Sequence, residues 1–75
     1  MANYSRQREA VRTYLMSTTE HPTADMVYDA VRAQYPAVSL ATIYRNLNLL
    51  IEMGQAVKII SSLGPDRFDG CVTPP

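Results

Sequence analysis

The sequence predicts a mainly helical domain that ends in a small β-hairpin. Three segments place apolar residues at helical spacing, and residues that typically begin or end helices flank them. After the third segment the pattern changes to two short strand-like runs separated by a turn-rich stretch. Because the chain has 75 residues, we expect one domain with a small core.

The first helix is predicted at residues 5–17, with Ser5 as its N-cap. Val11, Tyr14 and Leu15 recur at helical spacing and form its apolar side. The other faces carry three arginines, Arg6, Arg8 and Arg12. This helix is therefore amphipathic, and one of its sides is basic.

The second helix is predicted at residues 24–34, after the sequence HPTAD. Thr23 is the expected N-cap, and Asp25 falls in the first turn, where the helix dipole favours an acid. Prolines bracket the helix at positions 22 and 36. Its apolar stripe consists of Val27, Tyr28 and Val31.

The third helix is predicted between Ser39, its N-cap, and Gly54, its C-terminal stop. A stripe centred near Leu40, Leu47 and Ile51 is predicted to face the core. The full stripe comprises Leu40, Ile43, Tyr44, Leu47, Leu50 and Ile51.

The last segment is predicted to form a hairpin from a strand at 56–60, a turn at 61–66 and a strand at 67–70. Three helices followed by a hairpin are the order of a winged helix-turn-helix, with the second and third helices as the turn-helix pair. We expect this domain to cover residues 1–73. Pro74 and Pro75 would begin a linker to a further domain.

Composition excludes several classes of protein. Apolar residues make up 47% of the chain, which argues against disorder, and seven basic and seven acidic side chains cancel. The single cysteine, Cys71, excludes a disulfide framework, indicates a reducing compartment and is expected to be a free thiol. No apolar run approaches the roughly 18 residues of a membrane span. We therefore predict a cytoplasmic protein that does not bind membranes.

The outward face of the third helix has the composition of a DNA-reading surface. It carries Ala41, Thr42, Arg45 and Asn48 instead of a mixture of Glu and Lys. Arginine can make paired hydrogen bonds to guanine, asparagine can do so with adenine, and small side chains can contact a thymine methyl group. In the alternative interpretation, this is an ordinary exposed helix with little charge.

Three further predictions concern DNA contacts. By spacing alone, Tyr44 belongs to the edge of the core stripe, although it could also contact phosphate or a thymine methyl group. Arg67 could contact phosphate or pair with Asp66 or Asp69. The full set of predicted phosphate contacts is Arg6, Arg8 and Arg12 on the first helix, with Lys58 and Arg67 on the wing.

The sequence resembles the ferric uptake regulator family. The resemblance is carried by HPTADMVYDAVRAQYP, by VSLATIYRNLNLLIEMG and by RFDG, and it runs from about Ser5 to Asp69. It implies a bacterial metal-dependent transcription regulator, usually a repressor, whose N-terminal winged helix reads an AT-rich palindromic operator. It also implies a C-terminal domain that forms the homodimer, so this chain alone is expected to be a monomer.

The resemblance assigns roles to several residues. Tyr44 and Arg45 match the pair that contacts DNA, which reverses the assignment of Tyr44 from spacing alone. Arg6 and Arg8 match, more loosely, a region that approaches the DNA backbone or minor groove. In peroxide-sensing members, the positions of His21 and Asp69 bind a regulatory metal.

The expected cofactor is Fe(II) or Mn(II) at a regulatory site of the full-length protein. Structural Zn(II) would belong to the second domain, and no zinc is assigned to Cys71. Because His21 and Asp69 cannot complete a metal site alone, we expect this chain to bind no metal tightly. Peroxide sensing and the sensing of iron or another metal remain alternatives. Without the resemblance, His21 would be interpreted as a surface or loop residue and Asp69 as a turn residue.

Two other classes of function are open to the sequence. A winged helix can serve as a protein–protein interaction module. The support for this alternative is the zero net charge of the chain and Leu49, an apolar residue predicted to face outward. An enzyme is not expected, because one histidine and one cysteine form no catalytic constellation and the glycines form no phosphate-binding loop.

Overall fold

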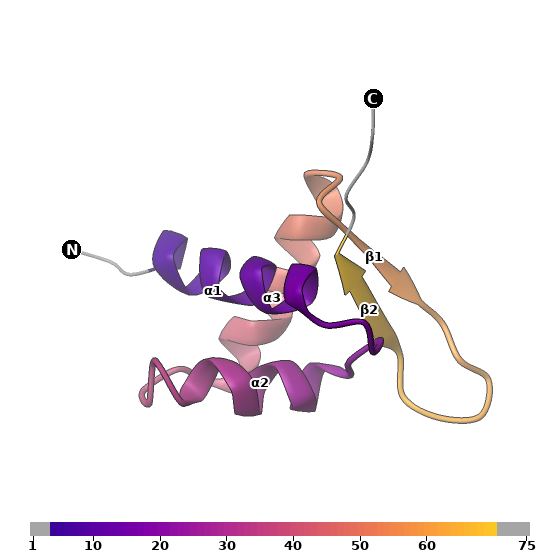
Figure 1. Cartoon of the computed structure of the whole chain (residues 1–75), viewed down its shortest axis with the longest axis horizontal. Helices are drawn as coiled ribbons and strands as arrows, with labels where there is room; N and C mark the ends of the chain where they lie inside the picture. The colour runs from indigo at the N-terminus through magenta and orange to yellow at the C-terminus, as the bar shows by residue number, and fades with distance from the viewer. Residues whose placement is uncertain (1–3, 71–75) are drawn as a thin grey trace.

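The computed structural model describes residues 4–70 and has three helices followed by a two-stranded hairpin (Figure 1). The helices are α1 (Tyr4–Ser17), α2 (Ala24–Arg32) and α3 (Leu40–Glu52), and the strands are β1 (Ala56–Ile59) and β2 (Arg67–Gly70). The predicted order of elements is therefore confirmed. Cys71 and the predicted linker at 74–75 lie outside the described residues.

The predicted N-caps of α2 and α3 and the predicted C-terminal stop of α3 act through specific hydrogen bonds. The Thr23 side chain accepts a bond from the backbone N–H of Met26, and Ser39 Oγ accepts one of 3.1 Å from Thr42. At the end of α3, Gly54 adopts a φ of 76°, a left-handed conformation that glycine reaches without steric cost. Its N–H donates to the Ile51 carbonyl at 3.0 Å, so α3 ends where the sequence predicted.

Three predicted boundaries are wrong by a small margin. Ser5 is not the N-cap of α1, because the helix already begins at Tyr4 and an N-cap residue has a non-helical backbone. Helix α2 ends at Arg32 instead of 34, and a turn follows in which the Tyr35 N–H donates to the Val31 carbonyl at 2.8 Å. Pro36 disfavours a helical conformation at the residue before it. Strand β1 ends at Ile59 instead of 60.

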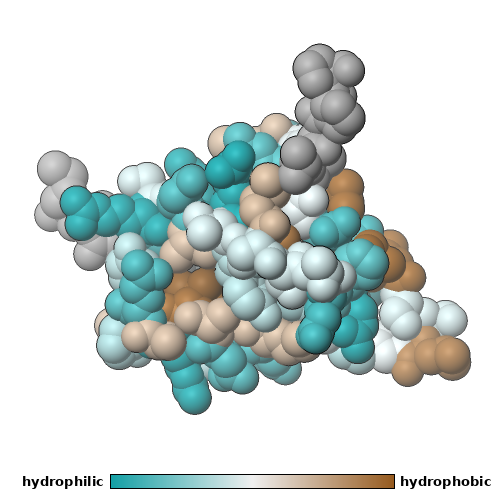
Figure 2. Space-filling view, in the orientation of Figure 1, coloured by the Kyte–Doolittle hydropathy of each residue, from teal (hydrophilic) through white to brown (hydrophobic). Residues whose placement is uncertain are grey.

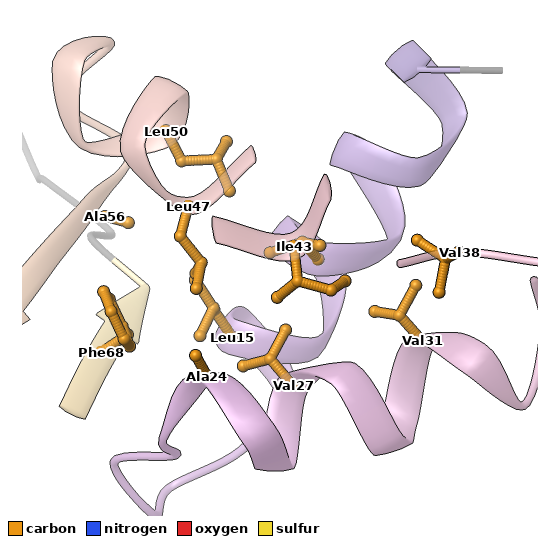
Figure 3. Close-up of a cluster of buried hydrophobic side chains, with 11 residues drawn as sticks. Leu15, Ala24, Val27, Val31, Val38, Ile43, Leu47, Leu50, Ala56 and Phe68 are labelled. Atoms are coloured by element: carbon orange, nitrogen blue, oxygen red, sulfur yellow. The ribbon is translucent and has the colours of Figure 1, made fainter. Parts of the chain in front are cut away.

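One core joins all five elements (Figure 3). Helix α3 contributes the centre of this core and contacts α1, α2 and β1. The buried apolar residues are Val11, Leu15, Ala24, Val27, Val31, Val38, Ile43, Leu47, Leu50, Ala56 and Phe68.

The buried face of α3 is rotated relative to the predicted stripe. Asn46, which is not part of the predicted stripe, is 2% exposed, whereas Leu40 and Tyr44 from the predicted stripe are 36% and 48% exposed. The physical reason is that α3 packs against α1, α2 and β1, so its buried face is set by three neighbours and not by the spacing of its apolar residues alone. The Asn46 amide nitrogen has no hydrogen-bond partner among the described residues.

The hairpin is antiparallel and is extended by a third short segment. Lys58 lies opposite Phe68, and Ile59 lies opposite Arg67. On its other edge β2 pairs with the loop before α2, where Thr23 bridges Arg67 and the Phe68 N–H donates to the Pro22 carbonyl at 2.9 Å. The loop that precedes α2 is thereby tied to the wing. None of the helices in the described part of the chain is long and apolar enough to cross a membrane.

Adjacent residues of α3 provide a test of this core. We expect Leu47→Ala to lower the free energy of unfolding by about 2–5 kcal/mol, because Leu47 is fully buried. We expect a smaller loss from Asn46→Ala, of about 1 kcal/mol or less, because that change also removes an unpaired buried amide. Urea denaturation of both variants measures the difference. Equal losses would mean that Asn46 makes a stabilising contact that this packing does not contain.

Candidate nucleic-acid interface

The outer face of α3 presents most of the residues predicted to read DNA. Ala41, Tyr44, Arg45 and Asn48 are exposed, and Thr42 is half-buried. These side chains span the N-terminal and central turns of a 13-residue helix whose opposite face is in the core. The packing therefore holds a rigid, mostly uncharged polar surface toward solvent.

The start of α3 is also fixed locally. Ser39 Oγ lies 3.0 Å from the Thr42 hydroxyl, in addition to accepting the Thr42 N–H. The Thr42 hydroxyl therefore already has a partner in the free protein. The N-cap Ser39 therefore restricts the rotation of the Thr42 side chain, which is predicted to face a base.

A groove of about 440 Å³ runs beside this face, between the start of α2, α3 and the wing. It brings together three of the predicted contact residues, Tyr44, Asn48 and Lys58. Asp25 and Asp66 also line it. Sequence reasoning treated these two acids as a helix-end residue and a turn residue, and only their position in the fold reveals that they border the groove.

The two basic residues of the wing lie on opposite faces of the hairpin. Lys58 shares a face with Phe68 and lines the groove, whereas Arg67 shares the other face with Asp69, because successive strand residues alternate. The Arg67 guanidinium donates a 2.8 Å hydrogen bond to the backbone carbonyl of His21. Among the described residues Arg67 forms neither of the predicted ion pairs, with Asp66 or with Asp69.

The basic residues of α1 are separated from this groove. Arg6 is exposed and lines a different hollow of about 400 Å³ between α1 and the end of α2, and Arg8 is half-buried. Arg12 lies 3.3 Å from Glu9 in an ion pair. The structure thus does not gather the predicted phosphate contacts into one patch.

His21 and Asp69 lie side by side although 48 positions separate them in the chain. The His21 Nε2 atom is 3.8 Å from Asp69 Oδ2, and the side chains are 51% and 42% exposed. Imidazole nitrogen and carboxylate oxygen are common ligands of divalent metals, with bonds of about 2.0–2.2 Å to zinc. A separation of 3.8 Å is therefore short enough for one ion to bind both. Within residues 4–70, no third His, Cys, Asp or Glu joins them in a metal-binding group.

Apolar residues gather at the outer part of the wing (Figure 2). Leu63 is 98% exposed and Ile60 is 80% exposed, and Val57 is also exposed. The sequence prediction had named Leu49 as the exposed apolar residue, but Leu49 is half-buried. The two most exposed large apolar side chains of the described residues, Ile60 and Leu63, thus lie in the wing and not on α3.

Comparison with known proteins identifies the family of this fold. The model of the ferric uptake regulator family matches residues 2–74, nearly the whole chain. The chain belongs to this family. The resemblance inferred from HPTAD, SLATIYRNL and RFDG is therefore confirmed.

Members of the ferric uptake regulator family with similar sequences include peroxide regulators. The chain is 40% identical over 63 residues to the peroxide-responsive repressor PerR of Staphylococcus epidermidis, an alignment that spans 84% of the chain and 42% of PerR. It is 35% identical to the peroxide stress regulator of Campylobacter jejuni, with a TM-score of 0.88 over 96% of the chain and 53% of that structure. The chain thus spans about half, or less, of the length of these relatives.

A more distant structure shares the fold alone. The ferric uptake regulator Fur of Helicobacter pylori is 21% identical, with a TM-score of 0.86 over 93% of the chain and 47% of that structure. The mainly helical winged-helix architecture is thus confirmed by structures of regulators with different sequences.

Two aromatic residues test whether Tyr44 belongs to the exposed face. We expect Tyr44→Ala to change the free energy of unfolding by less than about 1 kcal/mol, because the side chain is half-exposed. Phe68→Ala is the matched control and should cost about 3–5 kcal/mol, because Phe68 is buried. Thermal and urea unfolding measure both. A loss at Tyr44 as large as that at Phe68 would place Tyr44 in the core.

Proposed function

We propose that this chain is the DNA-binding domain of a metal-dependent bacterial transcriptional repressor. The observation that carries the proposal is the outer face of α3, which is rigid, polar and nearly uncharged and lies beside a groove that contains Lys58. Membership of the ferric uptake regulator family supports it. The proposed location is the cytoplasm, and no enzymatic activity is proposed.

In this proposal α3 enters the major groove of double-stranded DNA with its N-terminal turns toward the base edges. Arg45 would bind a guanine edge, Asn48 an adenine edge, and Ala41 and Thr42 would meet thymine methyl groups. Tyr44 would contact the backbone or a base at the border of the groove. Such a face suits an AT-rich operator, because most of its residues favour adenine or thymine.

Phosphate contacts would position the domain without reading sequence. Lys58 is the best placed of the basic residues, since it lines the same groove as Tyr44 and Asn48. Arg6 and Arg8 would reach the backbone from α1. We propose that the native protein binds a palindromic operator as a homodimer, because two half-sites about one helical turn or a multiple apart supply the affinity that one domain lacks.

We further propose that His21 and Asp69 hold a regulatory Fe(II) or Mn(II) ion together with ligands from outside the described residues. Their donor atoms fit one ion at their present separation, and a nitrogen and oxygen donor set suits these metals. Bound Fe(II) would catalyse the reaction of peroxide, the two-electron oxidant, with the adjacent His21; one peroxide oxygen would be added to the His21 imidazole and the other would leave as water. The similarity to the PerR of Staphylococcus epidermidis and to the peroxide stress regulator of Campylobacter jejuni favours peroxide over iron as the signal.

A second function, contact with another protein, is favoured by the exposed apolar wing. Leu63 and Ile60 would be the centre of such a surface. In that case Leu63→Ser would abolish partner binding and leave DNA binding unchanged.

Selection of duplexes from a random-sequence library tests the DNA-reading proposal. We expect the metal-loaded native protein to enrich an inverted repeat, and its affinity to fall steeply with salt concentration. We expect Arg45→Ala to weaken binding by about 1–3 kcal/mol and to relax selection at one base of each half-site.

Arg32→Ala is the matched control for the loss of one positive charge. Arg32 is exposed on α2, lies 3.8 Å from Asp29 and does not line the groove. We expect the Arg32→Ala variant to select the same sequences as the unchanged protein and to bind them with the same affinity. Equal losses from both variants, or no enriched sequence, would contradict direct reading by α3.

Peptide mass spectrometry tests the signal. The native protein, loaded with Fe(II) and treated with peroxide, should gain one oxygen atom at His21 and lose its operator binding. An Asp69→Ala variant should show little oxidation, because the ion would lose one of its ligands. An unmodified His21 with operator binding that follows free iron would instead indicate a metal-uptake regulator.

A further inference from the structure

His21 lies beside Asp69, but the attraction between the two side chains is too weak to fix their positions. Both side chains are about half exposed, and an ion pair in that environment contributes little. His21 belongs to the loop between α1 and α2, whereas Asp69 is on β2. Something other than the attraction between the two side chains must fix the loop on the strand.

Three backbone and packing features join the loop to β2. The Phe68 N–H donates to the Pro22 carbonyl at 2.9 Å, and Thr23 forms a bridge with Arg67. Pro22 and Phe68 are both buried, so this part of the loop is anchored in the core. These features hold positions 22 and 23, but they stop one residue short of His21.

The Arg67 side chain makes the contact to His21. Its Nη1 atom donates to the His21 carbonyl oxygen at 2.8 Å, a hydrogen bond between the two segments that involves His21 itself. Arg67 and Asp69 are two residues apart on one strand, so their side chains emerge on the same face of the hairpin. The guanidinium therefore ties the histidine backbone to the face from which the carboxylate projects.

We infer that Arg67 is a positioning residue for the regulatory metal pair and not principally a phosphate contact. The inference rests on the proposed metal-binding function of His21 and Asp69. Arg67 orders the backbone from which the imidazole extends, so the ion would meet two donors that are already in place. Lys58, on the other face of the hairpin, is then the basic residue of the wing that would contact phosphate.

The test measures Mn(II) affinity of the native protein by competition with a chelator. We expect Arg67→Met to weaken Mn(II) binding about tenfold, as is typical when an outer-shell partner of a metal ligand is removed. Arg67→Lys, which keeps a donor on a long side chain, should recover most of the affinity. At saturating Mn(II), the salt dependence of operator binding should match that of the unchanged protein.

Lys58→Met is the matched control on the same wing, and we expect it to change operator binding and not Mn(II) binding. It should lower the salt slope of operator binding by about one and leave Mn(II) affinity unchanged. A further readout needs no metal: in the metal-free protein, Arg67→Met should accelerate hydrogen exchange at the Phe68 amide, which donates to the loop.

Two results would overturn the inference. If Arg67→Met binds Mn(II) normally but lowers the salt slope, Arg67 is a phosphate contact. If His21→Ala also binds Mn(II) normally, the premise of a metal pair is wrong and the inference falls with it. Failure of the DNA-reading proposal is distinguished by the absence of an enriched duplex, which leaves the Mn(II) measurements intact.

Discussion

The packing of α3 against α1 and α2 determines what the rest of this domain can do. Ile43, Leu47 and Leu50 are fully buried, and their positions leave Tyr44, Arg45 and Asn48 in solvent. Because a helix in a packed core cannot rotate without exposing apolar surface, the contact face is fixed before any partner arrives. The N-cap Ser39 and the stop at Gly54, which follows the C-cap Met53, set the length of α3.

The pairing of β2 with the loop before α2 is the second constraint. It places the wing beside α3 on one side, where Lys58 enters the groove, and His21 beside Asp69 on the other. Lys58, a proposed DNA contact, and Asp69, a proposed metal ligand, thus lie on opposite faces of one small sheet.

Local chemistry made much of the fold predictable from the sequence. Thr23, Ser39 and Gly54 each act on backbone groups within a few residues, so their roles could be assigned without knowledge of tertiary contacts. The burial of Asn46 and the exposure of Tyr44 could not be predicted in this way, because they depend on how α3 packs against its neighbours. By spacing alone Tyr44 was assigned to the core, and the family resemblance corrected that assignment.

The candidate site was predicted less completely than the fold. The proximity of His21 and Asp69 depends on long-range pairing and was expected from the resemblance alone. The hydrogen bond from Arg67 to the His21 carbonyl joins positions 46 residues apart and has no signal in the sequence. Asp25 and Asp66 reach the groove through the fold, and neither was identified as part of an interface.

The central claim is that α3 and the groove beside it form the DNA-binding surface. Nuclear magnetic resonance of the isotope-labelled protein during titration with its selected duplex tests this most directly. We expect the largest amide shifts at Thr42, Arg45, Asn48 and Lys58. Shifts concentrated instead on the hollow between α1 and α2, or on the apolar wing around Leu63, would contradict it.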